Sequence, residues 1–107
     1  MTTFDDREKG FETKFAHDQE MAFRVTARRN RLIAVWAAGQ MGLTPEETDA
    51  YAKAVVQADF EEAGDEDVIR KLLGDLVSAG VDTDDTVIRN ELEVKTVEAR
   101  RQLLEAK

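Results

Sequence analysis

The sequence contains no cysteine, one proline (Pro45), one histidine (His17) and only 6 glycines among 107 residues. The absence of cysteine excludes disulfide bonds and thiolate metal sites, and it permits a reducing compartment. With a single histidine, a zinc site would need carboxylate ligands almost alone, and zinc sites are rarely built that way. Proline and glycine are the residues least compatible with a helix interior, so their scarcity favours helices along most of the chain.

The sequence also lacks a long hydrophobic run. The longest apolar stretch, from Leu32 to Gly39, is far shorter than the ~20 residues of a membrane-spanning helix. The first residues are acidic and aromatic, which is not the order of a signal peptide. We therefore expect a cytoplasmic protein with no direct membrane insertion.

The net charge is −8, and it is spread unevenly. Residues 19–42 hold four arginines and one glutamate, or +4 − 1 = +3, while residues 43–64 hold one lysine and six acids, or +1 − 6 = −5. Phosphate neutralisation supplies most of the affinity of nucleic-acid-binding proteins, so the acidic balance argues against such a partner. The length fits one domain, and 42% hydrophobic residues fit a folded one.

Helix start and stop signals divide the chain into segments. Thr44 precedes Pro45 and stands three residues before Glu47, which is the pattern of a capping box. Gly42 and Gly80 follow apolar segments and suit left-handed helix ends. Acidic residues after Gly64 and from Asp82 onward suit the positive end of a helix dipole. These signals predict an all-α, antiparallel four-helix bundle with helices at about 19–41, 45–61, 65–79 and 83–105.

Apolar residues recur at helical spacing in all four segments. The first stripe is predicted to centre on Val25, Leu32 and Trp36, with Ala22, Ile33 and Gln40 beside it. The other stripes are made of the following residues: Tyr51, Ala52, Val55 and Val56; Val68, Ile69, Leu72, Leu73, Leu76 and Val77; Ile88, Leu92, Ala99 and Leu103.

Two charged residues fall inside these apolar stripes. At 100° per residue, Arg29 lies on the apolar face of the first helix and Asp59 on that of the second. A buried charge without a partner is costly. Because the two residues are nearly level in an antiparallel hairpin turning near Leu43, we predict an ion pair between Arg29 and Asp59. The alternative is that Arg29 binds an external anion.

Residues 1–18 form a separate N-terminal arm. As a helix, this arm would place Phe4, Phe11 and Phe15 within about 40° of one another at 100° per residue. Gly10 and the short length make an isolated arm helix marginal in water, so we expect it to be only partly ordered. The arm either folds back, where Phe11 and Phe15 would cover the open end of the bundle, or waits for a groove on a partner.

Catalytic and metal motifs are missing from the sequence. The acidic segment from Asp59 fails as a calcium loop because Ala63 and Arg70 occupy ligand positions. There is no glycine-rich phosphate loop, nucleophile elbow or catalytic triad set. We therefore expect neither an enzyme nor a metal protein.

Ordered short segments carry a family resemblance. They are Phe4-Asp5-Asp6-Arg7-Glu8, Lys14-Phe15-Ala16-His17-Asp18, Phe23-Arg24, Ala27-Arg28-Arg29-Asn30-Arg31-Leu32, Trp36-Ala37-Ala38, Tyr51-Ala52, Asp59-Phe60, Gly64-Asp65-Glu66-Asp67-Val68 and Arg70-Lys71-Leu72. Together they closely resemble the ζ subunit of α-proteobacterial F-type ATP synthases over nearly the whole chain. The C-terminal quarter matches less distinctively.

The resemblance implies an inhibitory regulatory subunit with a four-helix body at 19–107. Its arm would enter a catalytic αβ interface near the rotor γ subunit and block hydrolysis as a one-way brake, on the cytoplasmic face of the inner membrane. The residues expected to bind the partner are Phe4, Arg7, Lys9, Phe11, Lys14, Phe15, Arg24, Arg28 and Arg31. No cofactor is expected beyond weak adenine nucleotide binding. The alternatives are a free-standing nucleotide- or small-ligand-binding bundle and an adaptor for another partner.

Overall fold

The structure is a computed structural model that describes residues 3–59 and 64–105, without the side chains of residues 3–18 and of Asp59. It contains four helices: α1 (Thr3–Met41), α2 (Pro45–Asp59), α3 (Glu66–Ser78) and α4 (Asp85–Glu105). No strand occurs in the described ranges. The all-α four-helix prediction is therefore confirmed. None of the described helices combines the length and hydrophobicity needed to cross a membrane.

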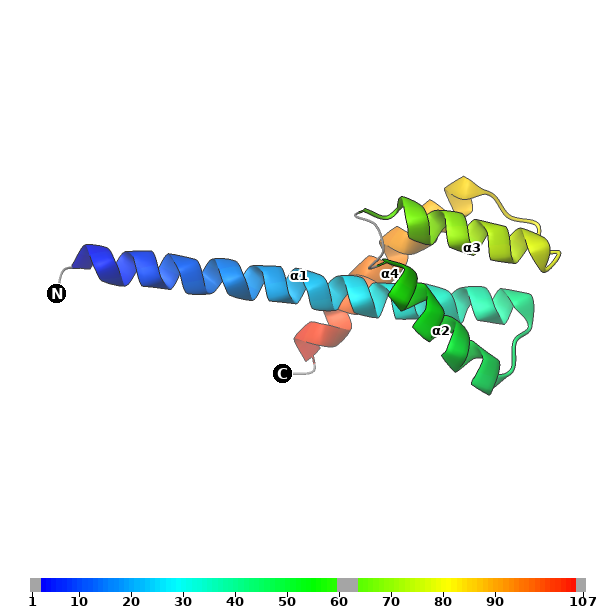
Figure 1. Ribbon diagram of the computed structural model, residues 1–107, viewed down its shortest axis with the longest axis horizontal. Coiled ribbons are helices and arrows are strands. Elements are labelled where there is room, and N and C mark those ends of the chain that lie inside the picture. Colours follow the sequence, from blue (N-terminus) through cyan, green and yellow to red (C-terminus); the bar gives the residue numbers. More distant parts are fainter. Residues whose placement is uncertain (1–2, 60–63, 106–107) are drawn as a thin grey trace.

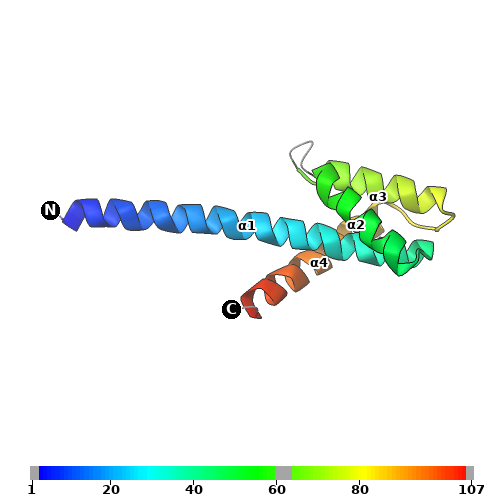
Figure 2. The same ribbon diagram turned by 60° about the horizontal axis from the view of Figure 1, so that its bottom comes forward.

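Helix α1 organises the molecule (Figure 1). Its C-terminal half packs mainly against α2 and α4, and α3 closes the bundle with smaller contacts to the other three helices. Its N-terminal part extends beyond the other helices in both views, which gives the chain a longest dimension of 65 Å (Figures 1 and 2). The helix has no break at residue 18, so the predicted arm and the first helix of the body form one continuous helix.

Most of the predicted helix ends are present where the structure describes them, but the predicted start at about residue 19 is not, because α1 already begins at Thr3. Thr44 Oγ1 accepts a hydrogen bond from the Glu47 backbone N–H at 3.1 Å, and the Thr44 N–H donates to Glu47 Oε1 at 2.9 Å. Gly42 and Gly80 have φ angles of 73° and 85°, which closes the preceding helices in the left-handed conformation. The Val87 N–H donates to Asp84 Oδ1 at 3.0 Å. The predicted end of the second helix at 61 falls outside the described residues.

Replacing Thr44 by alanine should lower the free energy of unfolding by about 1 kcal/mol, because the substitution removes one half of the capping box. Urea denaturation followed by circular dichroism would measure the change. Thr86→Ala is a matched control, since Thr86 is exposed within α4. Equal stability of the two variants would show that the cap contributes nothing.

The core is aliphatic and lies where the four helices meet. The buried residues that form it are Ile33, Ala34, Ala37, Ala52, Val55, Val68, Ile69, Leu72, Leu76, Ile88 and Leu92. The stripes predicted for the last three helices supply most of them. Val77 was predicted in the stripe of the third helix but is 55% exposed, because at 100° per residue it lies about 140° around the helix from the buried Leu72.

The apolar face of the first helix differs from the predicted one. Val25 and Ile33 are buried as predicted, but the buried centre also includes Ala34, Ala37 and Ala38, which have no exposed area, while Gln40 and Ala22 are exposed. Leu32 and Trp36 lie half-buried at the edge. The physical reason is that α1 is packed against α2 on one side and α4 on another, so small alanines are needed where the helices approach each other.

Candidate partner-binding site

The N-terminal part of α1 carries the first group of predicted partner-binding residues. Their backbone lies within the part of α1 that extends away from the bundle (Figure 1). They are Phe4, Arg7, Lys9, Phe11, Lys14 and Phe15. Their side chains lie outside the described part of the structure, so the aromatic stripe remains a prediction.

The second predicted group, Arg24, Arg28 and Arg31, lies together on the exposed surface of α1. The three arginines line one groove between α1, α2 and α4 with a volume of about 820 Å³. We call this the basic groove. Its lining residues are Phe23, Arg24, Ala27, Arg28, Arg31, Lys53, Val56, Gln57 and Leu103. The groove therefore combines four cationic side chains with an apolar lining.

Lys53 is a groove residue that sequence reasoning did not find. It comes from α2, and its Nζ lies 3.2 Å from Asp49 Oδ2. Arg31 Nη2 lies 3.2 Å from the other carboxylate oxygen of Asp49. The hydrogen bond from Lys53, and then that from Arg31, lowers the pKa of Asp49. No local pattern in the sequence could place Lys53 beside the arginines, because their proximity depends on how α1 and α2 pack.

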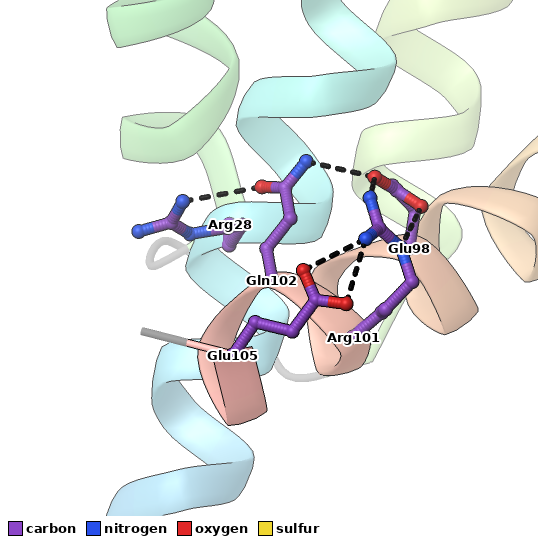
Figure 3. Close-up of polar contacts among 5 residues, drawn as sticks. All are labelled: Arg28, Glu98, Arg101, Gln102 and Glu105. Carbon is purple, nitrogen blue, oxygen red and sulfur yellow. Dashed lines mark hydrogen bonds and ion pairs between the residues drawn. The ribbon is translucent and has the colours of Figure 1, made fainter. Parts of the chain in front are cut away.

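Side chains of α4 contact Arg28, one of the residues that line the basic groove (Figure 3). Arg28 Nη1 donates to Gln102 Oε1 at 3.1 Å, and Gln102 Nε2 donates to Glu98 Oε1 at 3.0 Å. Arg101 pairs with Glu98 and, at 2.8 Å, with Glu105. The hydrogen bonds from Arg101 and then from Gln102 lower the pKa of Glu98 to about 2. This chain of contacts connects α1 to α4 and orients Arg28 at the groove.

The basic groove keeps an excess of positive charge. Arg24 pairs with Glu20 at 2.5 Å, and Arg31 and Lys53 share Asp49, which gives four cations and two anions, or +4 − 2 = +2. The whole chain has a net charge of −8. The groove is therefore a basic surface on an acidic molecule, and it complements an acidic or anionic partner.

Arg29 does not face the basic groove. It is 7% exposed, and its Nε and Nη2 donate to Asn30 Oδ1 at 3.0 and 2.8 Å. Nη2 also donates to Asp65 Oδ1 at 2.9 Å. The Asp59 side chain lies outside the described part of the structure, so the Arg29–Asp59 pair remains a prediction.

Asn30 and Asp65 are two partners of Arg29 that sequence reasoning missed. Asp65 was interpreted as an acid at a helix start, but it makes no side-chain capping hydrogen bond in α3. Its carboxylate points to Arg29 instead. Asn30 is fully buried, and within the described structure its Nδ2 has no hydrogen-bond partner. The contact with Asp65 joins residues 36 positions apart and is tertiary, so no spacing rule predicts it, whereas Asn30 is the next residue along α1.

The described residues contain no group of three histidine, aspartate or glutamate side chains arranged to hold a metal ion. The basic groove, with four cationic side chains and an apolar lining, is suited to binding another molecule through charge and apolar area.

Known proteins similar to the chain match most of its length. A family profile described as "ATPase inhibitor subunit zeta" matches residues 1–102. A protein whose structure was solved by NMR in solution is 42% identical, and the match covers 81% of this chain and 99% of that chain with a TM-score of 0.72. No curated protein sequence matches the chain.

Proposed function

Because the chain belongs to the ATPase inhibitor subunit zeta family, we propose that it inhibits ATP hydrolysis by inserting its N-terminal helix at a catalytic αβ interface of an F-type ATP synthase. Its role as an inhibitory subunit associated with that enzyme follows from the family. The proposal adds the mechanism of a one-way brake, the contacts with the α, β and rotor γ subunits, and a location on the cytoplasmic face of the inner membrane.

The observation that carries the proposal is the continuity of α1. A helix that starts at Thr3 and ends at Met41 joins the predicted arm directly to the core residues Ile33 and Ala37. At 1.5 Å per residue, the arm of residues 3–18 can reach about 24 Å from the bundle. A force on the inserted arm would pass along one helix into a packed body, which suits a part that must resist a turning rotor.

The basic groove supports the same proposal, because it begins next to the arm along α1. Arg24 lies six residues after Asp18 and Arg28 lies one turn further. When the arm is inserted, these cations would meet the rim of the enzyme's cleft. Cations at the rim of an interface mainly increase the association rate and the salt dependence of binding.

A direct test adds the purified protein to the ATP synthase of its own organism from which the ζ subunit has been removed. We expect ATP hydrolysis to fall while ATP synthesis continues, because the brake acts in one direction. A chain lacking residues 1–18 should keep its helical circular dichroism and lose the inhibition. Full inhibition by the shortened chain would contradict the arm mechanism, and no inhibition by the full chain would contradict the function.

A second candidate function is weak binding of adenine nucleotides. The observation in its favour is the basic groove, where four cations surround an apolar lining suited to a phosphate chain and a base. Titration of the ¹⁵N-labelled protein with ATP should then shift amide signals of groove residues, and shifts elsewhere or none would contradict this site.

A further inference from the structure

Helix α4 carries apolar residues on two opposite faces. One face is buried and supplies Ile88, Leu92 and Ala99 to the interior. The opposite face supplies four large apolar side chains that remain exposed: Val87 at 42%, Val94 at 55%, Val97 at 66% and Leu104 at 65%. We call this second set, together with Asn90 and Arg101 between them, the outer face of α4. A solvent-facing helix surface normally carries mostly polar side chains.

The outer face of α4 has the spacing of a helix-packing seam. Its residues follow one another at intervals of three and four: Val87, Asn90, Val94, Val97, Arg101 and Leu104. This alternation is the heptad pattern that keeps one stripe against a neighbouring helix. Val94 and Val97 line an open hollow of about 470 Å³ with Lys95 and Glu98. The seam therefore offers both apolar area and a recess for side chains of a partner.

Arg101 does not prevent such packing. Its guanidinium is held by Glu98 and Glu105 along α4, as Figure 3 shows. The charge is thus neutralised within the helix, and the methylene stem is left to contribute apolar surface.

We infer that the outer face of α4 is a second docking surface for the ATP synthase, and that its occupant is an amphipathic helix with an apolar ridge flanked by basic residues. The inference rests on the proposed function for the identity of the enzyme, but it does not depend on the arm. It gives the four-helix body a binding role of its own.

The charges beside the seam support a basic occupant. Six residues flank the seam at the positions that pair across a coiled coil. They are Thr86, Glu91, Glu93, Glu98, Arg100 and Glu105. Glu91 pairs with Lys95, and Glu98 and Glu105 share Arg101, so four acids and three bases leave −4 + 3 = −1 along the seam. Opposite charges at these positions favour pairing, whereas like charges oppose it.

The same charges argue against a second copy of the chain. In a parallel pair Glu93 would face Glu98, and in an antiparallel pair the flank with Glu91, Glu98 and Glu105 would face itself. The net charge of −8 adds further repulsion. The chain's own arm is also poorly matched, because residues 3–18 hold three bases and five acids, or +3 − 5 = −2.

The C-terminal end of α4 and the arm lie toward the same side of the bundle. In both views, the C-terminal end of α4 leads toward the side of the bundle from which the N-terminal part of α1 extends (Figures 1 and 2). An enzyme that binds the arm would therefore lie on the same side of the bundle as the C-terminal end of α4.

The test compares full-length variants in binding to the ζ-depleted catalytic sector of the organism's ATP synthase, measured by surface plasmon resonance and by inhibition of hydrolysis. Val94→Lys/Val97→Lys should weaken binding at least about tenfold, because lysines remove apolar contact and repel a basic helix. Inhibition at saturating protein should remain, since the arm is unchanged. Val77→Lys is the matched control, because Val77 on α3 is as exposed as Val94, at 55%.

A second pair of substitutions tests the charge of the occupant. Val94→Glu/Val97→Glu removes the same apolar contacts but attracts a basic helix, so it should lose less affinity than the lysine variant. The reverse order would overturn the basic occupant. If the lysine variant binds like Val77→Lys while the wild type inhibits, the docking surface is wrong and the proposed function stands.

Two further outcomes would also overturn the inference. If the wild type neither binds nor inhibits the enzyme, the proposed function and the inference both fail. If sedimentation shows a wild-type dimer that Val94→Lys/Val97→Lys dissociates, the outer face is an interface between copies.

Should the lysine variant lose its circular dichroism signal, Val94→Thr/Val97→Thr keeps the shape of valine and should still weaken binding relative to Val77→Thr.

Discussion

Replacing Phe4, Phe11 and Phe15 by alanine in the full-length chain should raise the concentration needed for half-maximal inhibition of ATP hydrolysis on the order of 100-fold. Aromatic side chains that fill pockets of an interface are typical binding hot spots, and each can contribute about 2 kcal/mol or more. A loss of 1.4 kcal/mol is a tenfold loss of affinity, and such losses are not additive. The measurement is steady-state hydrolysis by the ζ-depleted enzyme titrated with each variant.

The matched control for the phenylalanine variant is Asp6→Ala/Thr13→Ala. At 100° per residue both positions lie on the opposite side of the helix from the aromatic stripe. We expect the control to change inhibition by less than about fivefold. If the phenylalanine variant inhibits as well as the control, the aromatic stripe is not the contact with the enzyme.

The same phenylalanine variant separates the two predicted positions of the arm. If Phe11 and Phe15 covered the open end of the bundle in the free protein, their removal would lower its melting temperature, because buried aromatic side chains stabilise a core. With an arm that extends beyond the bundle as α1 does, we expect no change in the melting temperature.

Replacing Arg29 by methionine should lower the free energy of unfolding by about 2–3 kcal/mol. Most of this loss comes from Asn30, whose fully buried amide would lose the two hydrogen bonds that its Oδ1 accepts. A buried polar group left without a partner costs about 1–3 kcal/mol. The ion pair with Asp65 contributes less, because the Asp65 side chain is 51% exposed and solvent screens the charge.

Urea denaturation of Arg29→Met beside Arg28→Met would measure this effect. Arg28 is the adjacent arginine on the same helix but is exposed, so its replacement should change stability by less than about 0.5 kcal/mol. Equal stabilities of the two variants would show that the buried cluster contributes nothing.

Double-mutant cycles would then identify the carboxylate partner of Arg29. We expect coupling between Arg29→Met and Asp65→Asn, because their side chains are 2.9 Å apart. The guanidinium has donors enough for a second carboxylate, so a cycle with Asp59→Asn tests the Arg29–Asp59 prediction separately.

Local signals were sufficient to predict four helices and most of their ends. The capping box at Thr44 and Glu47 and the left-handed Gly42 and Gly80 each act within one turn of the chain, so the residues themselves specify them. The stripe of Phe4, Phe11 and Phe15 is likewise a prediction from local sequence, since it depends only on helical periodicity.

Only the tertiary structure decided which residues from different helices meet. Lys53 joins Arg28 at the basic groove, Asp65 reaches Arg29, and Val94 stays on the outside of α4, all because of how the four helices cross. The heptad spacing along α4 is visible in the sequence, but a helix with two apolar faces does not show which face the bundle buries. Helix crossing angles depend on side chains far apart in the chain, so only the packing of the four helices determines which face of α4 is buried.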